Sequence, residues 1–244
     1  MTNFVLVDFD DTLVDTGPRF RERRDALFSF LEELGFPRAH AYRIHHEVVD
    51  RELLGIWGYG PFRLGASFRD TYLRLCSEDG RIPEPVAARR AEALADGIDE
   101  PPPTLPGALD ALARLAAALP VAIYTQSAFP TYQTRCIENS GVFDIVPPSR
   151  LVITPDKSPE SYRAALRSLD AGPAERSCMV GNSVRSDVNP ALLSGARAIW
   201  VDAGDPWHAD LADPLEGDLT RVESFPEAVE VLLPPAPPST STPR

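Results

Sequence analysis

The chain has 244 residues, of which 43% are hydrophobic and 25% are charged, and its formal net charge at pH 7 is −12. These values are ordinary for a folded globular protein, and the length predicts one large α/β domain or a core with an insertion. The negative balance argues against nucleic acid or an anionic membrane surface as a partner, because such binding relies on clustered lysines and arginines. We therefore expect a small-molecule substrate.

The sequence also predicts the cellular location of the protein. It contains no apolar stretch of about 18 residues, and it opens on a strand pattern rather than on the basic and then apolar pattern of a signal peptide. The cysteines, Cys76, Cys136 and Cys178, are widely spaced and form no Cys-x-x-Cys pair, which predicts reduced thiols and no zinc site. We expect a cytoplasmic protein without a membrane partner.

The first predicted element is a short apolar strand that ends in crowded carboxylates. Residues 4–7 are predicted as a buried parallel strand, and Asp8, Asp10 and Asp11 follow it. The carboxyl ends of such strands lie at the ligand crevice, where crowded carboxylates repel one another unless a cation sits among them. Hard oxygen ligands suit Mg²⁺. The alternative is an acidic N-cap cluster for the next helix, to which Asp11 and Asp15 would contribute.

The next part of the chain, residues 17–103, is predicted to be helical throughout and to form a separate domain. Apolar periodicity predicts helices at about 19–34, 39–54, 66–78 and 84–96, with a glycine-rich loop at 55–65. The run Pro101-Pro102-Pro103 marks a stiff return linker. Helical insertions of this kind often carry dimer contacts, so the sequence allows a monomer or a homodimer.

From Leu105 onward the pattern alternates between helix and strand, which predicts a right-handed parallel α/β sheet. The predicted strands cover residues 121–124, 143–146, 177–180 and 198–201, and the predicted helices cover about 107–119, 130–140, 159–169, 188–194 and 226–233. The Pro-, Ser- and Thr-rich residues 234–244 are predicted to be disordered. The predicted organisation is an α/β core of residues 1–16 and 104–233, a helical domain and a tail.

Polar residues follow the predicted strands at several points. Thr125 follows the second strand, Lys157 precedes a helix, and Asp187 follows the strand at 177–180, so all lie at the same sheet edge as Asp8. Lys157 is the single lysine among the 24 basic residues. Since a guanidinium cannot replace a compact ammonium at every site, the bias suits a functional role for Lys157. Chance survival of a surface lysine is the equal alternative.

In this order, the motif Asp8-Phe9-Asp10-Asp11-Thr12-Leu13, Thr125, Lys157 and Asp187 closely resemble the haloacid dehalogenase-like (HAD) hydrolase superfamily. The resemblance extends up to about Leu233, and the helical insertion resembles that family's cap domain. It implies a Rossmann-like parallel sheet flanked by helices with an all-α cap. It also implies a Mg²⁺-dependent phosphatase that hydrolyses a small-molecule phosphate ester.

The resemblance further implies the role of each residue. Asp8 would be the nucleophile that forms an aspartyl phosphate, with Mg²⁺ bridging its carboxylate and the phosphoryl oxygens. Asp10 would protonate the leaving oxygen and later deprotonate the attacking water, while its backbone carbonyl binds the metal. Lys157 would pair with both the phosphoryl group and Asp8. The implied phosphate-binding residues are Phe9, Thr125, Gln126 and Lys157. For Thr125 the alternative is an ordinary strand-end hydroxyl.

The implied metal ligands are Asp8, Asp10, Asn182 and Asp187. The chain departs from the family at Asn182, where the family often has an aspartate. An amide oxygen can bind Mg²⁺ but adds no charge, so metal affinity would fall or a water would intervene, and Asp187 becomes the favoured acidic ligand. A helix N-cap is the alternative role for Asp187.

Specificity would depend on the helical domain. The loop from Gly55 to Arg63 combines glycines, aromatic residues and one cation, which suits a lid over an anionic substrate, although packing within the domain is the alternative. The candidate specificity residues are Trp57, Tyr59 and Arg63. We expect a solvated face at Arg19, Arg21, Arg23 and Arg24, and exposed histidines at His40, His45 and His46.

Three other functions remain open. A phosphomutase would capture a second sugar hydroxyl, which depends on cap closure that the sequence does not reveal. A haloacid dehalogenase would use the same Asp8 to displace halide, but Asp10 argues against it because a halide leaving group needs no acid. A non-catalytic HAD-like binding module is favoured by Asn182 and opposed by the retention of Asp8, Asp10, Thr125 and Lys157.

Overall fold

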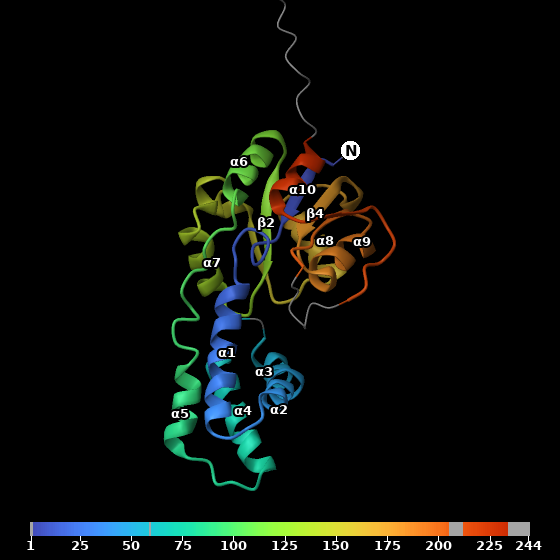
Figure 1. Cartoon of the computed structure of the whole chain (residues 1–244). Helices are drawn as coiled ribbons and strands as arrows, with labels where there is room; N and C mark the ends of the chain where they lie inside the picture. Colours follow the sequence, from blue (N-terminus) through green and yellow to red (C-terminus); the bar gives the residue numbers. More distant parts are fainter. Residues whose placement is uncertain (1, 59, 205–211, 234–244) are drawn as a thin grey trace, which may run out of the picture.

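The computed structural model describes residues 2–58, 60–204 and 212–233, so the predicted disordered tail lies outside the described residues. Within these ranges, six parallel strands form one sheet in the order β3-β2-β1-β4-β5-β6. The strands are β1 (Phe4–Val7), β2 (Val121–Gln126), β3 (Leu151–Thr154), β4 (Ser177–Gly181), β5 (Arg197–Val201) and β6 (Leu219–Val222). Because β1 lies between β2 and β4, the carboxyl ends of these strands adjoin at one sheet edge (Figure 1).

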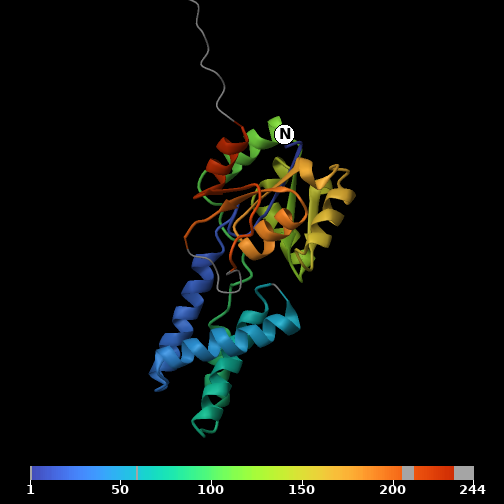
Figure 2. The same ribbon diagram turned by 90° about the vertical axis from the view of Figure 1, so that its right-hand side faces the viewer.

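Helices cover both faces of the sheet (Figure 2). One face buries Val5 and Val7 against α6, α7 and α10, and the other buries Phe4 and Leu6 against α8 and α9. This alternation follows from the pleat, because successive side chains of a strand point to opposite faces. The helices are α6 (Ala108–Ala118), α7 (Pro130–Asn139), α8 (Pro159–Ser168), α9 (Asn189–Leu193) and α10 (Phe225–Leu232), joined by short helical turns at Val142–Asp144, Pro148–Arg150, Ala174–Arg176 and Val184–Val188. The arrangement confirms the predicted parallel α/β fold.

The helices between β1 and α6 pack on one another beyond the carboxyl ends of the strands and are called the helical unit below (Figures 1 and 2). They are α1 (Gly17–Glu33), α2 (Arg38–Arg43), a π-helical turn (Ile44–Val49), α3 (Asp50–Trp57), α4 (Arg63–Glu78) and α5 (Pro85–Ala93). Leu27, Leu31, Phe68 and Leu75 lie in the hydrophobic core of this unit, and the cores on the two faces of the sheet contain none of them.

None of the helices in the described ranges is both long and apolar enough to cross a bilayer.

Two strands differ from the predictions. Residues 143–146 do not form a strand: Val142–Asp144 is a short 3-10 turn, and the third strand is Leu151–Thr154. Prolines at 147 and 148 lack the N–H groups that a sheet ladder needs, whereas β3 pairs in register with residues 123–126 of β2. β6 has no counterpart among the predicted strands. It is an edge strand in which Val222 alone is buried, so its sequence lacks the apolar run that marks a buried strand.

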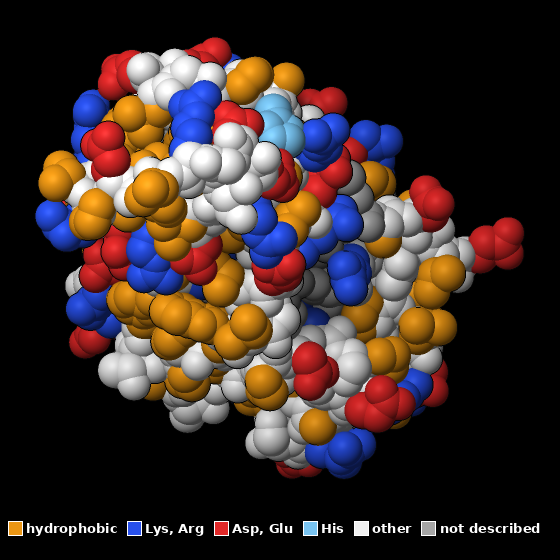
Figure 3. All heavy atoms as spheres, turned by 90° about the horizontal axis from the view of Figure 1, so that it is seen from below, with side chains coloured by type: hydrophobic (Ala, Val, Ile, Leu, Met, Phe, Trp, Pro, Cys, Tyr) orange, Lys and Arg blue, Asp and Glu red, His pale blue; other side chains and the backbone are white. Residues whose placement is uncertain are grey.

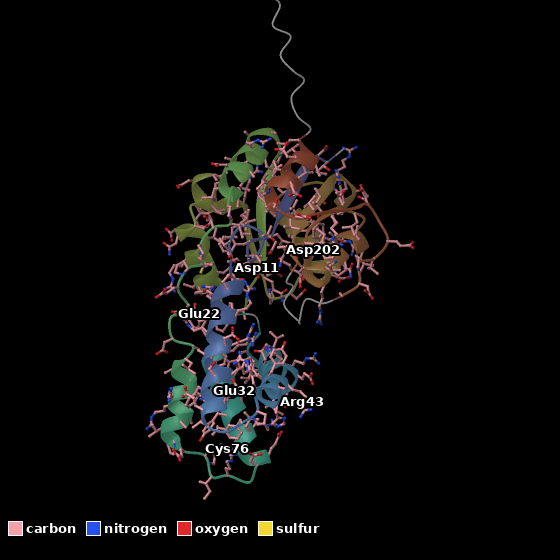
Figure 4. All side chains as sticks on the ribbon, in the orientation of Figure 1. Asp11, Glu22, Glu32, Arg43, Cys76 and Asp202 are labelled. Atoms are coloured by element: carbon pink, nitrogen blue, oxygen red, sulfur yellow. The ribbon has the colours of Figure 1, made fainter. Side chains whose placement is uncertain are left out.

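The start of α1 depends on Asp11, which has a left-handed backbone φ of +54°. Its Oδ1 accepts hydrogen bonds from the backbone N–H groups of Thr16 at 2.8 Å and Gly17 at 3.1 Å, and from the Thr16 hydroxyl at 2.5 Å. Figure 4 shows Asp11 where the chain passes from the sheet into α1. These contacts satisfy N–H groups that have no partner inside the helix. Of the acidic cap considered for Asp11 and Asp15, Asp11 therefore makes the capping contacts, while Thr16 occupies the N-cap position itself.

We expect Asp11→Ala to lower the free energy of unfolding by about 1 kcal/mol, because the first turn of α1 loses its acceptor. Alanine also fits the left-handed backbone less well than aspartate. Urea denaturation followed by far-ultraviolet circular dichroism measures the change. Asp11→Asn is the matched control, since it keeps an acceptor oxygen and tolerates the same backbone, and it should lose less than half as much. Equal losses in the two variants would contradict the capping role.

Candidate functional site

A cavity of about 610 Å³ lies between the carboxyl edge of the sheet and the helical unit. The sheet side, called the floor, includes Asp8, Asp10, Thr125, Gln126, Lys157, Asn182 and Asp187. The helical side, called the wall, is basic and aromatic and includes Arg19, Phe20, Arg21, Arg24, Phe28, Tyr42, His46 and Arg63. Figure 3 shows a hollow right of centre that lysine and arginine side chains, in blue, border. The structure thus brings together the residues that the sequence placed at the strand ends.

Lys157 is the centre of the floor. Its Nζ donates hydrogen bonds to Asp8 Oδ1 and to Asp187 Oδ1, each at 2.5 Å, and all three side chains are less than a tenth exposed. Burial alone would lower the pKa of Lys157, but the Asp187 and Asp8 carboxylates outweigh burial and raise the pKa above its ordinary value. One ammonium therefore offsets the repulsion between two buried carboxylates.

Asp8 follows β1 and is also held on its other oxygen. The Thr12 hydroxyl lies 3.3 Å from Asp8 Oδ2 and 3.3 Å from Asn182 Oδ1, so it donates between the two acceptors. Burial raises the pKa of Asp8 well above its usual value, and the Lys157 ammonium opposes that shift. The ionised form of Asp8 consequently depends on positive charge placed beside it.

Asp10 and Thr125 are connected by Gln133, a residue that the sequence analysis missed. Gln133 Nε2 donates to Asp10 Oδ2 at 2.6 Å and to Thr125 Oγ1 at 3.1 Å. Because Thr125 accepts this hydrogen bond, its own hydroxyl hydrogen is free to donate into the cavity. Burial raises the pKa of Asp10 to about 6, although the hydrogen bond from Gln133 opposes the shift. Gln133 is a buried amide within the apolar stripe of α7, beside Tyr132 and Cys136, and that was the available signal.

Asp187 is positioned by the turn after β4. The backbone N–H of Ser183 donates to Asp187 Oδ2 at 3.0 Å, and a Cβ added at Gly181 would stand only 2.4 Å from the same carboxylate. Glycine is therefore required for this close approach. The N-cap role considered for Asp187 belongs to Ser183, whose Oγ accepts from the N–H of Ser186 at 3.0 Å.

The floor provides oxygen ligands suited to a hard divalent cation. Among the described residues, no group of three or more His, Cys, Asp or Glu side chains is arranged to hold a metal. The predicted ligand set is not such a cluster of side chains alone. It combines the carboxylates of Asp8 and Asp187 with the Asn182 amide oxygen and the Asp10 backbone carbonyl. These are hard oxygen donors, and Mg²⁺ in proteins is commonly held by one or two carboxylates and keeps several waters. The residues present fit Mg²⁺ on the chemistry of this donor set.

The remaining predicted residues differ in whether their side chains reach the cavity. Phe9 is fully buried in the core beneath the floor, so any contact with phosphate involves its backbone. Gln126 lines the cavity, but its Nε2 donates to the Pro155 carbonyl at 2.9 Å. Trp57 is 42% exposed and is not among the cavity residues. Tyr59 lies outside the described residues, and Arg63 lines the wall.

The wall corrects two expectations. The expected solvated face does not form, because three of its members line the cavity: Arg19, Arg21 and Arg24. Arg23 is not among the cavity residues, and its Nε donates to the Asp96 carbonyl at 3.1 Å. His45 and His46, expected to be exposed, are 0% and 7% exposed. Both histidine rings pack against Phe28, because the π-helical turn directs them into the core of the helical unit.

Comparisons with known proteins all find similarity to hydrolases. The family model of haloacid dehalogenase-like hydrolases matches residues 2–195. A phosphoserine phosphatase from Thermus thermophilus is 28% identical over 233 aligned residues, which cover 82% of this chain and 88% of that protein. A haloacid dehalogenase-like family hydrolase from Xanthomonas campestris superimposes with a TM-score of 0.76 at 28% identity, covering 95% of this chain and 91% of that one.

A more distant structure shares the fold alone. The L-2-haloacid dehalogenase from Xanthobacter autotrophicus superimposes with a TM-score of 0.58 at 18% identity, covering 97% of this chain and 100% of that one.

We expect Lys157→Met to lower the free energy of unfolding by about 3 kcal/mol in metal-free buffer, because it leaves two buried carboxylates facing each other without a cation. Chemical denaturation in the presence of a chelator measures the loss. The double variant Asp8→Asn with Lys157→Met has only one of the two buried charges, so it should recover a substantial part of the lost free energy of unfolding.

Arg114→Met is the matched control for Lys157→Met. Arg114 pairs with Glu230 at 2.6 Å, but both side chains are about half exposed, so solvent screens the pair. Its removal should leave the denaturation midpoint nearly unchanged. Equal midpoints for Lys157→Met and the unsubstituted protein would contradict the assigned role of Lys157 in the floor.

Proposed function

Because the chain belongs to the haloacid dehalogenase-like hydrolase family, we propose that it is a Mg²⁺-dependent phosphatase acting on a small phosphate ester. The observation that supports this most strongly is the Lys157 ammonium between the buried carboxylates of Asp8 and Asp187 at the cavity floor. The similarity to a phosphoserine phosphatase also favours a phosphate ester. In this proposal residues 17–103 form the cap over an α/β core of residues 1–16 and 104–233.

The first half of the proposed reaction transfers the phosphoryl group to the protein. A carboxylate oxygen of Asp8 attacks phosphorus, the bond from phosphorus to the leaving oxygen breaks, and Asp10 gives its proton to that oxygen. Lys157 and the Thr125 hydroxyl bind phosphoryl oxygens, and Gln133 orients both Thr125 and Asp10. The product of this half is an aspartyl phosphate on Asp8 and a free alcohol.

The second half releases phosphate. The Asp10 carboxylate takes a proton from a water that attacks phosphorus, and the bond between phosphorus and the Asp8 oxygen breaks. Asp8 is then a carboxylate again, and Asp10 holds the proton needed for the next turnover. Asp8, Asp187, Asn182 and the Asp10 carbonyl would hold Mg²⁺, which when bound neutralises charge on the phosphoryl oxygens.

A haloacid dehalogenase is the alternative enzyme, since the same Asp8 would displace halide. The contacts around Asp10 favour the phosphatase. Gln133 holds Asp10 beside Thr125 at the floor, where an alkoxide leaving group needs a proton. A halide ion leaves without one, so a dehalogenase has no use for this arrangement.

We expect the purified protein to hydrolyse 4-nitrophenyl phosphate in the presence of Mg²⁺, and Asp8→Asn to reduce kcat by at least about 1,000-fold, because the amide is a poor nucleophile. Asp110→Asn is the matched control, since Asp110 is exposed on α6 and distant from the cavity lining. The absorbance of the released 4-nitrophenolate follows the reaction.

The same assay separates the alternatives. No turnover of 4-nitrophenyl phosphate or of any phosphate ester would favour the binding module. Halide release from 2-chloropropionate without added metal would favour the dehalogenase.

We expect Asn182→Asp to lower the half-activating Mg²⁺ concentration by about tenfold, because a second acidic ligand adds the charge that the amide lacks. The measurement is a titration of phosphatase activity with MgCl₂. Asn139→Asp makes the same chemical change at an exposed position of α7 and should not alter the titration. An unchanged titration for Asn182→Asp would show that residue 182 is not a metal ligand.

A further inference from the structure

Arg24 interrupts the apolar stripe of α1. Phe20, Arg24 and Phe28 are spaced four residues apart, so they share one face of the helix, and all three line the cavity wall. The Arg24 guanidinium lies over the Phe20 ring, with 5.7 Å between its central carbon and the ring centroid. A cation at such a position is unusual, because this face of a helix normally carries apolar side chains toward the core.

The charge of Arg24 is not balanced by an adjacent carboxylate. Within the described ranges, no carboxylate oxygen lies within 4.0 Å of its guanidinium, and its Nε is buried without a hydrogen-bond partner. Burial lowers the pKa of Arg24, although Asp50 opposes the shift. The Arg24 side chain is half-buried. A partly desolvated charge with no carboxylate beside it favours a ligand that brings negative charge.

The other arginines of the wall have different contacts. Arg63 is buried and forms an ion pair with Asp50. Arg19 donates to the Glu100 carbonyl and to the Tyr132 hydroxyl, the latter at 3.4 Å. The Arg21 guanidinium folds back over Gly17, with Nη1 2.8 Å from the place of a Cβ. Arg24 is therefore the wall arginine best placed to bind a ligand in the cavity.

The position of Arg24 sets the size of that ligand. It lies seven residues after Gly17, which is about 10 Å along α1 at the rise of a helix. Asp11 on the floor side caps the start of this helix, so Arg24 lies well away from the phosphoryl site. A cavity of about 610 Å³ leaves room for a substrate that reaches both places.

We propose that Arg24 binds a second anionic group, a carboxylate or a second phosphoryl group, at the end of the substrate opposite the scissile phosphate. The inference rests on the proposed phosphatase function and narrows its substrate class to phosphate esters with two anionic ends. Phe20 and Phe28 line the wall one helical turn before and after Arg24, where they would contact the middle of such a substrate. A substrate ending in an ammonium group fits less well, because the wall carboxylate Asp25 pairs with Arg38 at 2.7 Å.

Matched pairs of phosphate esters test this inference. One pair is glucitol 6-phosphate and 6-phosphogluconate, both open chains, which end in a hydroxymethyl group and a carboxylate respectively. The other is fructose 6-phosphate and fructose 1,6-bisphosphate. The doubly anionic member of at least one pair should have a kcat/KM about tenfold or more above that of its partner, as a charge-assisted hydrogen bond provides. The pair with the raised kcat/KM ratio shows whether Arg24 binds a carboxylate or a second phosphoryl group.

Arg24→Met should reduce the ratio within the responding pair to about one, and Arg24→Lys should retain part of it because the charge remains. Arg23→Met is the control on the same helix, since Arg23 pairs with Glu22 outside the cavity, and it should keep the full ratio. Circular dichroism spectra show that each variant is folded.

Failure of this inference is distinct from failure of the proposed function. Hydrolysis of 4-nitrophenyl phosphate with ratios near one in both pairs, or a ratio that Arg24→Met does not change, would overturn the role of Arg24 while leaving the phosphatase intact. Absence of hydrolysis for every phosphate ester, including 4-nitrophenyl phosphate, would instead overturn the phosphatase.

Discussion

The floor of the cavity depends on one buried ammonium group held between two buried carboxylates. Lys157 comes from the loop after β3, Asp8 from the end of β1 and Asp187 from the turn after β4, so the ion pairs join three separate parts of the sheet edge. Because β1 is the central strand of this region, its carboxylates meet residues from both sides. The parallel sheet is therefore the reason that residues far apart in sequence share one site.

The floor carries more negative than positive charge. Two carboxylates with one cation leave a negative balance in a poorly solvated place, which favours binding of further positive charge and disfavours an isolated anion. A phosphoryl group is an anion, so the proposed chemistry requires that the floor first be neutralised. This is the physical link between the donor set around Asp8 and the proposed dependence on Mg²⁺.

The parts of the site that the sequence predicted are those that follow directly from strand ends. Asp8 and Asp10 come just after β1, Thr125 lies at the carboxyl end of β2, and Asp187 lies in the turn after β4. The position of a parallel strand end determines where such residues lie. Gln133 and Arg24 could not be placed in the same way, because each sits inside a helix whose orientation depends on tertiary packing. Their signal was a polar side chain within an apolar stripe, and that pattern also arises on ordinary surface helices.

The errors in the fold have a similar origin. Residues 143–146 have the apolar composition of a strand, but two prolines follow them and strand pairing begins only at Leu151. The expected exposure of His45 and His46 failed because helical periodicity shifts at the π-helical turn, which no local pattern in the sequence marks. Local composition indicated the elements, while their registers and faces depended on contacts between distant segments.

In the proposed mechanism Asp8 is the residue that accepts the phosphoryl group. Mass spectrometry of the peptide that contains Asp8, after acid quenching during turnover with Mg²⁺, tests this assignment most directly. The account predicts a peptide heavier by one phosphoryl group, with the modification on Asp8 and removed by hydroxylamine. An unmodified Asp8 peptide under conditions of steady turnover, or a phosphoryl group on another residue, would contradict it.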